Sequence, residues 1–111
     1  MNNLNSLIVE GTVEKTEIKE TNTSKIAIVF LKTVRSYRNA DGFTVEEEST
    51  FEVLCYGNMV DYVAKFAKDG RGVRVVGRLK QEKWWDGDDI QRSKIVVICE
   101  HIEFKPFKEE K

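Results

Sequence analysis

The chain has 111 residues, of which 41% are hydrophobic and 33% charged, and its net charge is −1. This size and composition are typical of one soluble globular domain, and the balanced charge means that any basic site is a local face. No apolar run approaches the roughly 20 residues of a transmembrane helix, and the N-terminus lacks the basic segment of a secretory signal. We therefore expect a cytoplasmic protein with no membrane partner.

The first half of the sequence predicts three β-strands. Residues 4–18 form the first, with Gly11 inside it, and a glycine within a strand often marks a bulge or bend. Residues 25–38 form the second strand, which begins apolar on both faces and is therefore expected to be buried on both sides there. An Asp-Gly turn at residues 39–42 predicts a hairpin into the third strand, residues 43–57.

Residues 58–68 predict the chain's helix. Asn58 is a suitable N-cap, and Gly70 is a suitable stop signal. The spacing of the apolar residues predicts one buried stripe. This stripe consists of Met59, Tyr62, Val63 and Phe66.

Two further strands follow the helix, at residues 70–85 and 90–104, and an Asp-Gly-containing turn at 85–89 joins them. Three strands, a helix and two strands form the element order of an all-β, five-stranded Greek-key barrel of the oligonucleotide-binding (OB) fold. We expect this OB-fold domain to span residues 1–105 and residues 106–111 to be a short, frayed C-terminus.

The sequence contains no motif that favours catalysis. It lacks a phosphate-binding P-loop and a dinucleotide fingerprint, and its one histidine, His101, has no second histidine to complete a zinc set or a proton relay. Cys55 and Cys99 lie in apolar runs, which favours two buried thiols over ligands. We therefore predict no enzyme activity, no metal and no cofactor.

The stretch from Gly70 to Trp85 is the most informative in the chain. Cations alternate with its apolar residues, and two tryptophans end it. Cations follow a phosphate backbone and aromatic faces stack on unpaired bases, so the pattern favours single-stranded nucleic acid. The alternative is an amphipathic strand with a solvated basic face and two tryptophans that cap the core.

Similar clusters of aromatic and basic residues occur at the ends of the second and third strands. Tyr56 fits a stacking platform or a core tyrosine equally well, and adjacent Trp84 and Trp85 should point to opposite faces, so that one packs inward while the other meets ligand. The predicted contact residues combine aromatic and basic side chains. They are Tyr37, Tyr56, Trp84, Trp85, Arg35, Arg38, Arg71, Arg74, Arg78, Lys80 and Lys83.

The order of these motifs resembles the bacterial single-stranded DNA-binding protein (SSB) family over residues 4–104. The matching parts are Asn5 to Gly11, Ala27 to Leu31, Ser36-Tyr37-Arg38, Val53 to Gly57, Gly70 to Leu79 and Lys83-Trp84. The resemblance implies an OB fold, assembly into tetramers, and sequence-tolerant binding of single-stranded DNA in replication, recombination and repair. It also implies base stacking by Tyr37, Tyr56 and Trp84, and a location at the nucleoid.

Two departures from the family pattern limit this resemblance. The family usually has an additional stacking aromatic where this chain has Thr50, and Phe51 is expected to face the other side. The Gly/Pro/Gln-rich linker with an acidic tip has no counterpart in residues 103–111. Recruitment of replication and repair enzymes through such a tail is therefore not implied.

The leading hypothesis is a non-enzymatic, sequence-tolerant binder of single-stranded DNA that forms a homo-oligomer. A tetramer is favoured and a dimer is possible, because the edges of barrel strands invite pairing between chains. The main alternative is an OB-fold assembly subunit that binds nucleic acid weakly or not at all. A sugar- or RNA-binding OB domain is the third interpretation.

Overall fold

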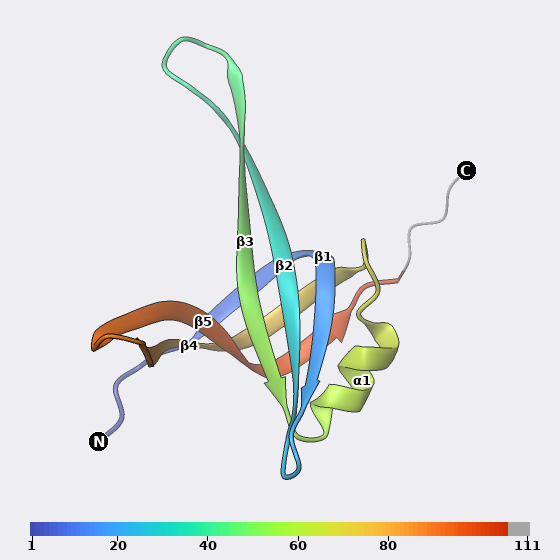
Figure 1. The fold of residues 1–111 in the computed structure, drawn as a ribbon. Helices are drawn as coiled ribbons and strands as arrows, with labels where there is room; N and C mark the ends of the chain where they lie inside the picture. Colours follow the sequence, from blue (N-terminus) through green and yellow to red (C-terminus); the bar gives the residue numbers. More distant parts are fainter. Residues whose placement is uncertain (107–111) are drawn as a thin grey trace.

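The computed structural model describes residues 1–106 and shows a closed barrel in the strand order β1-β2-β3-β5-β4 (Figure 1). The predicted fold class is confirmed, because a single helix lies between β3 and β4. The expected fraying falls largely on residues 107–111, which lie outside the described residues. The elements are β1 (Leu7–Glu20), β2 (Lys25–Arg38), β3 (Thr44–Tyr56), α1 (Met59–Phe66), β4 (Gly72–Asp86) and β5 (Ile90–Phe104).

Strand β1 serves both sides of the barrel. It pairs with β4 through residues 7–12 and with β2 through residues 12–20. The register shift lies between Val13 and Lys15, so Glu14 is the bulged residue. Gly11 is not part of this bulge and has a different role. A Cβ on Gly11 would collide with the carbonyl oxygen of Lys32, so this glycine allows β2 to approach the bend.

The barrel interior is filled by alternate residues of its strands. Strand β2 contributes Ala27, Val29 and Leu31, all fully buried, and β3 contributes Val53 and Cys55. The same cluster includes Cys99 of β5, which confirms that both cysteines are buried. The neighbouring Cys99 thiol, and then burial, raise the pKa of Cys55, so Cys55 stays protonated at neutral pH.

Helix α1 closes one end of the barrel, and the predicted stripe is only partly correct. Val63 is buried and Met59 packs against the core, but Val60 is buried in place of Tyr62. Val60 and Val63 are its fully buried residues. Tyr62 is 44% exposed and packs its ring beside those of Phe66 and Phe104. Asn58 occupies the predicted N-cap position, but its side chain makes no capping hydrogen bond. The helix is held by its contact with the barrel rather than by its cap.

Two hairpins extend from the barrel in different directions (Figure 1). The β2–β3 hairpin stays paired out to Arg38 and Thr44, and the β4–β5 hairpin out to Asp86 and Ile90. Among residues 1–106 no helix is long and apolar enough to cross a membrane. The same residues contain no group of three or more His, Cys, Asp or Glu side chains that could hold a metal ion.

Candidate nucleic-acid interface

The outer surface of β2, β3, β5 and β4 carries a second apolar cluster. Cross-strand pairing links Ile28 to Leu54, Leu54 to Ile98, and Ile98 to Arg78, so one row of side chains crosses four strands. Ile28, Leu54, Val96 and Ile98 are each at most 7% exposed. Together we call these four residues the floor. They confirm that the first half of β2 is buried on both of its faces.

Two predicted stacking aromatics share the face of the floor. Tyr56 pairs with Ile26, which packs against the floor, and Tyr56 is 42% exposed. Trp84 lies on β4 four residue pairs beyond the Lys80–Val96 pair, so its side chain is on the same face as that of Lys80, and it is 43% exposed. Each ring is therefore half-accessible at a margin of one apolar surface, which is the geometry required to stack on an unpaired base.

Basic side chains surround the floor on β4 and β5. Arg78 and Lys80 pair with Ile98 and Val96, and they were predicted contacts. The same face carries Arg92, opposite Trp84, and Lys94, opposite Glu82, which the sequence analysis missed. The alternation of side chains along β5 could have shown that Arg92 and Lys94 share one face of that strand. Only the β4–β5 register, however, places this face beside Trp84 and Lys80.

Each of these four cations contacts a carboxylate. Arg92 Nε lies 3.0 Å from Asp86, and Lys94 Nζ lies 2.9 Å from Glu52. The Arg78 contact to Glu100 is 3.8 Å and the Lys80 contact to Glu82 is 3.6 Å. All four basic side chains are 46–54% exposed, so these ion pairs are weak and solvent-screened. A phosphate could replace the carboxylate at little cost.

The predicted cluster on the β2–β3 hairpin is divided between two faces. Tyr37 pairs with Val45 and has the parity of Leu31, so it lies on the face opposite Tyr56. Arg35 shares that face, and its guanidinium lies 5.5 Å from the centroid of the Tyr37 ring. Arg38 has the other parity and donates from Nε to the carbonyl oxygen of Gly42 at the hairpin tip. Tyr37 and Arg35 therefore form a separate aromatic–cation pair.

The two tryptophans point to opposite faces, as predicted, but neither packs inward. Trp85 is 69% exposed and pairs with Gln91, and Lys83 has the same parity. Trp84 and Trp85 both lie beyond the closed part of the barrel, where the hairpin encloses no interior. Phe51 likewise faces away from Thr50, as expected, because Phe51 pairs with Leu31 of the barrel interior.

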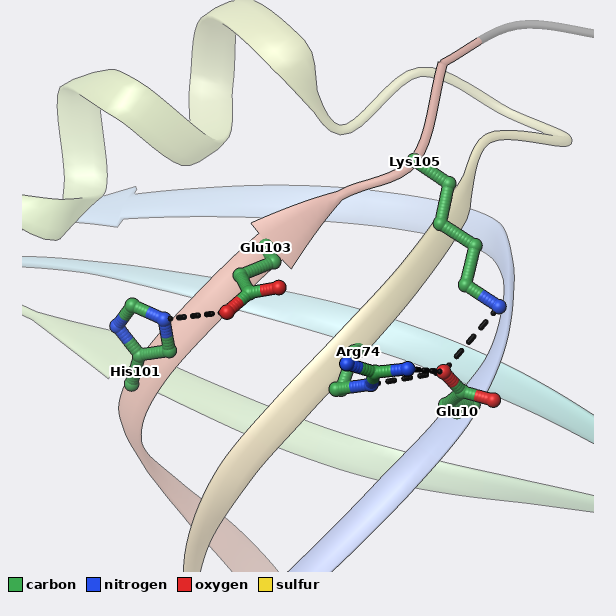
Figure 2. Close-up of polar contacts among 5 residues, drawn as sticks. All are labelled: Glu10, Arg74, His101, Glu103 and Lys105. Carbon is green, nitrogen blue, oxygen red and sulfur yellow. Dashed lines mark hydrogen bonds and ion pairs between the residues drawn. The ribbon is translucent and has the colours of Figure 1, made fainter.

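Arg71 and Arg74 both lie away from the floor. Arg74 belongs to the β1–β4–β5 side of the barrel (Figure 2). Arg74 Nη2 lies 2.7 Å from Glu10 Oε2, and Lys105 Nζ lies 3.2 Å from the same oxygen. Hydrogen bonds from Arg74 and then Lys105 lower the pKa of Glu10. Arg71 donates from Nε to the carbonyl oxygen of Lys105 and lies over the Phe104 ring. The structure therefore does not bring these two arginines together with Tyr56 and Trp84.

The lone histidine belongs to the same side of the barrel as Arg74. His101 Nε2 lies 3.0 Å from Glu103 Oε1, and both side chains are more than half exposed (Figure 2). His101 is therefore a solvent-exposed histidine paired with a carboxylate.

Comparison with known proteins shows the family of this chain. A sequence model described as "Single-strand binding protein family" matches residues 4–105. A single-stranded DNA-binding protein of Aquifex aeolicus is 41% identical over 69 residues, which cover 61% of this chain and 46% of that protein. The chain spans about half the length of the curated relatives it matches, between 45% and 58%.

Solved structures share the barrel over nearly the whole chain. A structure described as Plasmodium falciparum SSB in complex with ssDNA superposes with a TM-score of 0.84 at 25% identity, and covers 96% of this chain and 98% of that chain. The wild-type single-stranded DNA-binding protein from Thermus aquaticus superposes with a TM-score of 0.77 at 22% identity, over 93% of this chain and 50% of that chain. At that identity the second likeness shows the fold alone.

Proposed function

The chain belongs to the single-strand binding protein family, and from this premise we propose that it binds single-stranded DNA without sequence preference. It would protect and organise single strands during replication, recombination and repair, in the cytoplasm at the nucleoid. The family is a non-enzymatic one, which agrees with a role in binding rather than catalysis.

The observation that carries this proposal is the composition of one face. An apolar floor lies between half-exposed Tyr56 and Trp84, and four exposed cations surround it. Stacking is worth about 1–3 kcal/mol per base and accepts any base, whereas hydrogen-bond donors to base edges would impose a sequence. The cations would contact the sugar-phosphate backbone of the DNA, which is the same for every sequence.

Fluorescence titration with oligo(dT) tests the proposal, because bases stacked on Trp84 quench its emission. We expect saturable quenching whose affinity falls with salt by roughly 0.7 log units per log unit of salt for each phosphate neutralised. Duplex of the same length should bind much more weakly, because its bases offer no open faces. Absence of quenching together with absence of binding by sedimentation would favour the assembly-subunit alternative. Preferential competition by oligo(rU) or glycans would favour the third interpretation.

We also propose that the chain forms a homo-oligomer, most simply a tetramer. An apolar groove at the barrel mouth supports this proposal; it is lined by Leu7, Ile8, Val9, Phe51, Leu79 and Val97. Ile8 is 71% exposed and Leu79 49%, so a second copy of the chain would bury apolar surface there. Sedimentation equilibrium at micromolar concentration distinguishes the 12.8 kDa monomer from a dimer or tetramer.

A further inference from the structure

Phe30 is a third aromatic residue on the face of the floor, and the predicted contacts did not include it. It lies on β2 and packs against the floor, from which it remains partly exposed. Its cross-strand partners are Lys15 on β1 and Glu52 on β3. It has the parity of Ile28 and of Tyr56's partner Ile26, so its ring belongs to the same surface as Tyr56.

A flexible lysine side chain lies over the ring of Phe30. Lys15 Nζ lies 4.6 Å from the centroid of the ring, a cation–π contact. The Lys15 side chain is 59% exposed, and it also forms an exposed ion pair with Glu17 at 3.5 Å. Because an exposed pair of this kind contributes little energy, Lys15 can leave the ring at small cost.

The backbone below Lys15 is fixed by the bulge in β1. Glu14 is the bulged residue, and its carboxylate accepts a hydrogen bond of 2.9 Å from the hydroxyl of Thr50 on β3. This contact joins β1 to β3 across β2, which is the strand that carries Phe30. The position from which Lys15 extends is therefore defined, while its ammonium group remains free to move.

From this arrangement we propose that Phe30 and Lys15 form a nucleotide subsite. The proposal rests on the proposed function and adds a contact to it. One base stacks on the Phe30 ring in the place of the Lys15 ammonium, and Lys15 moves to the adjoining phosphate. The exchange keeps both groups satisfied, because the ring retains a flat polarizable partner and the cation gains a full negative charge.

The chain contains a matched control for this pair. Lys65 Nζ lies 5.4 Å from the centroid of the Phe66 ring, which is also a lysine over a phenylalanine. That pair lies on α1, where Phe66 packs against Tyr62 and Phe104 rather than against the floor. Replacements at Lys65 and Phe66 therefore change a similar contact away from the proposed DNA surface.

The first test compares Phe30→Leu with Phe66→Leu in oligo(dT) binding, with melting temperatures measured in parallel. We expect Phe30→Leu to weaken binding about fivefold or more and Phe66→Leu to bind like the parent. An oligomer of abasic deoxyribose phosphates should bind Phe30→Leu and parent equally, because it has no base to stack. Lys15→Gln should lower the salt slope by roughly 0.7, and Lys65→Gln should not change it.

The second test uses the parent protein, so it does not depend on the folding of a variant. Oligo(dT) with single 5-iodouracil substitutions is photocrosslinked, and the tryptic peptides are identified by mass spectrometry. Residues 26–32 form one such peptide, in which Phe30 is the only aromatic residue. Crosslinks to this peptide support the subsite. Crosslinks to residues 84–92 without any to 26–32, together with a Phe30→Leu variant that binds like the parent, would overturn it. A parent that does not bind oligo(dT) would instead refute the proposed function.

Discussion

Two exposed regions of this barrel are rich in basic side chains, and they differ in what lies beneath the charge. On the β2–β3–β5–β4 face, cations surround a buried apolar floor with half-exposed aromatic rings at its margins. On the β1–β4–β5 side, Arg74 and Lys105 converge on one carboxylate, that of Glu10 (Figure 2). The first region is not set apart by a lack of counter-ions, because its cations contact carboxylates as well. It is set apart by the apolar floor that the neighbouring strands supply beneath the charge.

The largest expected effect is on the free energy of unfolding, and it distinguishes apolar packing in the first region from ion pairing in the second. Leu54→Ala removes a 4% exposed side chain from the floor and should lower the free energy of unfolding by about 2–5 kcal/mol. Arg74→Met breaks an exposed ion pair and should leave the denaturation midpoint almost unchanged. Urea denaturation measures both variants. Equal midpoints for Leu54→Ala and the parent would show that the floor does not contribute to the core.

Stacking should come next in size. Trp84→Ala and Tyr56→Ala should each weaken oligo(dT) binding by about 1–3 kcal/mol while the melting temperature changes little, because both rings are half-exposed. Fluorescence anisotropy of a labelled oligonucleotide measures the affinity without relying on tryptophan. Parental affinity in both folded variants would remove the face from consideration as the DNA site.

Tyr37 extends this comparison to the other side of the β2–β3 hairpin. It remains a predicted contact, although its ring lies on the face opposite Tyr56. Tyr37→Ala should weaken binding to a long oligonucleotide that wraps around the hairpin more than binding to a short one that occupies the floor. A length series of oligo(dT) measures this difference, and equal losses at all lengths would place Tyr37 within the same short site.

A carboxylate inside the proposed binding face should limit the affinity for DNA. Glu52 pairs with Lys94 at 2.9 Å and lies opposite Phe30. Glu52→Gln frees that cation and removes a repulsion of phosphate, and it should tighten oligo(dT) binding about two- to fivefold. Glu10→Gln changes the same charge on the other side of the barrel and should not alter affinity. Tighter binding by both variants would indicate a general effect of net charge.

The smallest expected effect is the acid sensitivity of the Glu10 contact. Arg74 and Lys105 lower the pKa of Glu10 in the folded protein below its unfolded value. The stability that this contact adds is therefore present at neutral pH and is lost as the pH falls through the lowered pKa. Arg74→Met should remove part of this dependence, so its melting temperature should decline less than that of the parent on acidification. Identical declines would show that the contact does not form in solution.

Several features of this protein follow from the sequence because their causes are local. Turn residues and apolar alternation predict the order of strands and helix, and an apolar run on both faces of residues 25–31 predicts burial on both sides. The opposed directions of Trp84 and Trp85, and of Thr50 and Phe51, follow from the two-residue period of a strand. The same reasoning failed for the inward packing of one tryptophan, because both lie where the hairpin has left the barrel.

Which residues belong to the proposed binding face depended on long-range pairing instead. The parallel contact of Val53 and Leu54 with Val97 and Ile98 joins two distant parts of the chain, and it brings Lys94 and Arg92 to the face of Tyr56. The bulge at Glu14 resets the parity of β1 and thereby places Lys15 over Phe30. Alternation fixes which residues of one strand share a face, but register and barrel closure decide which strands' faces meet.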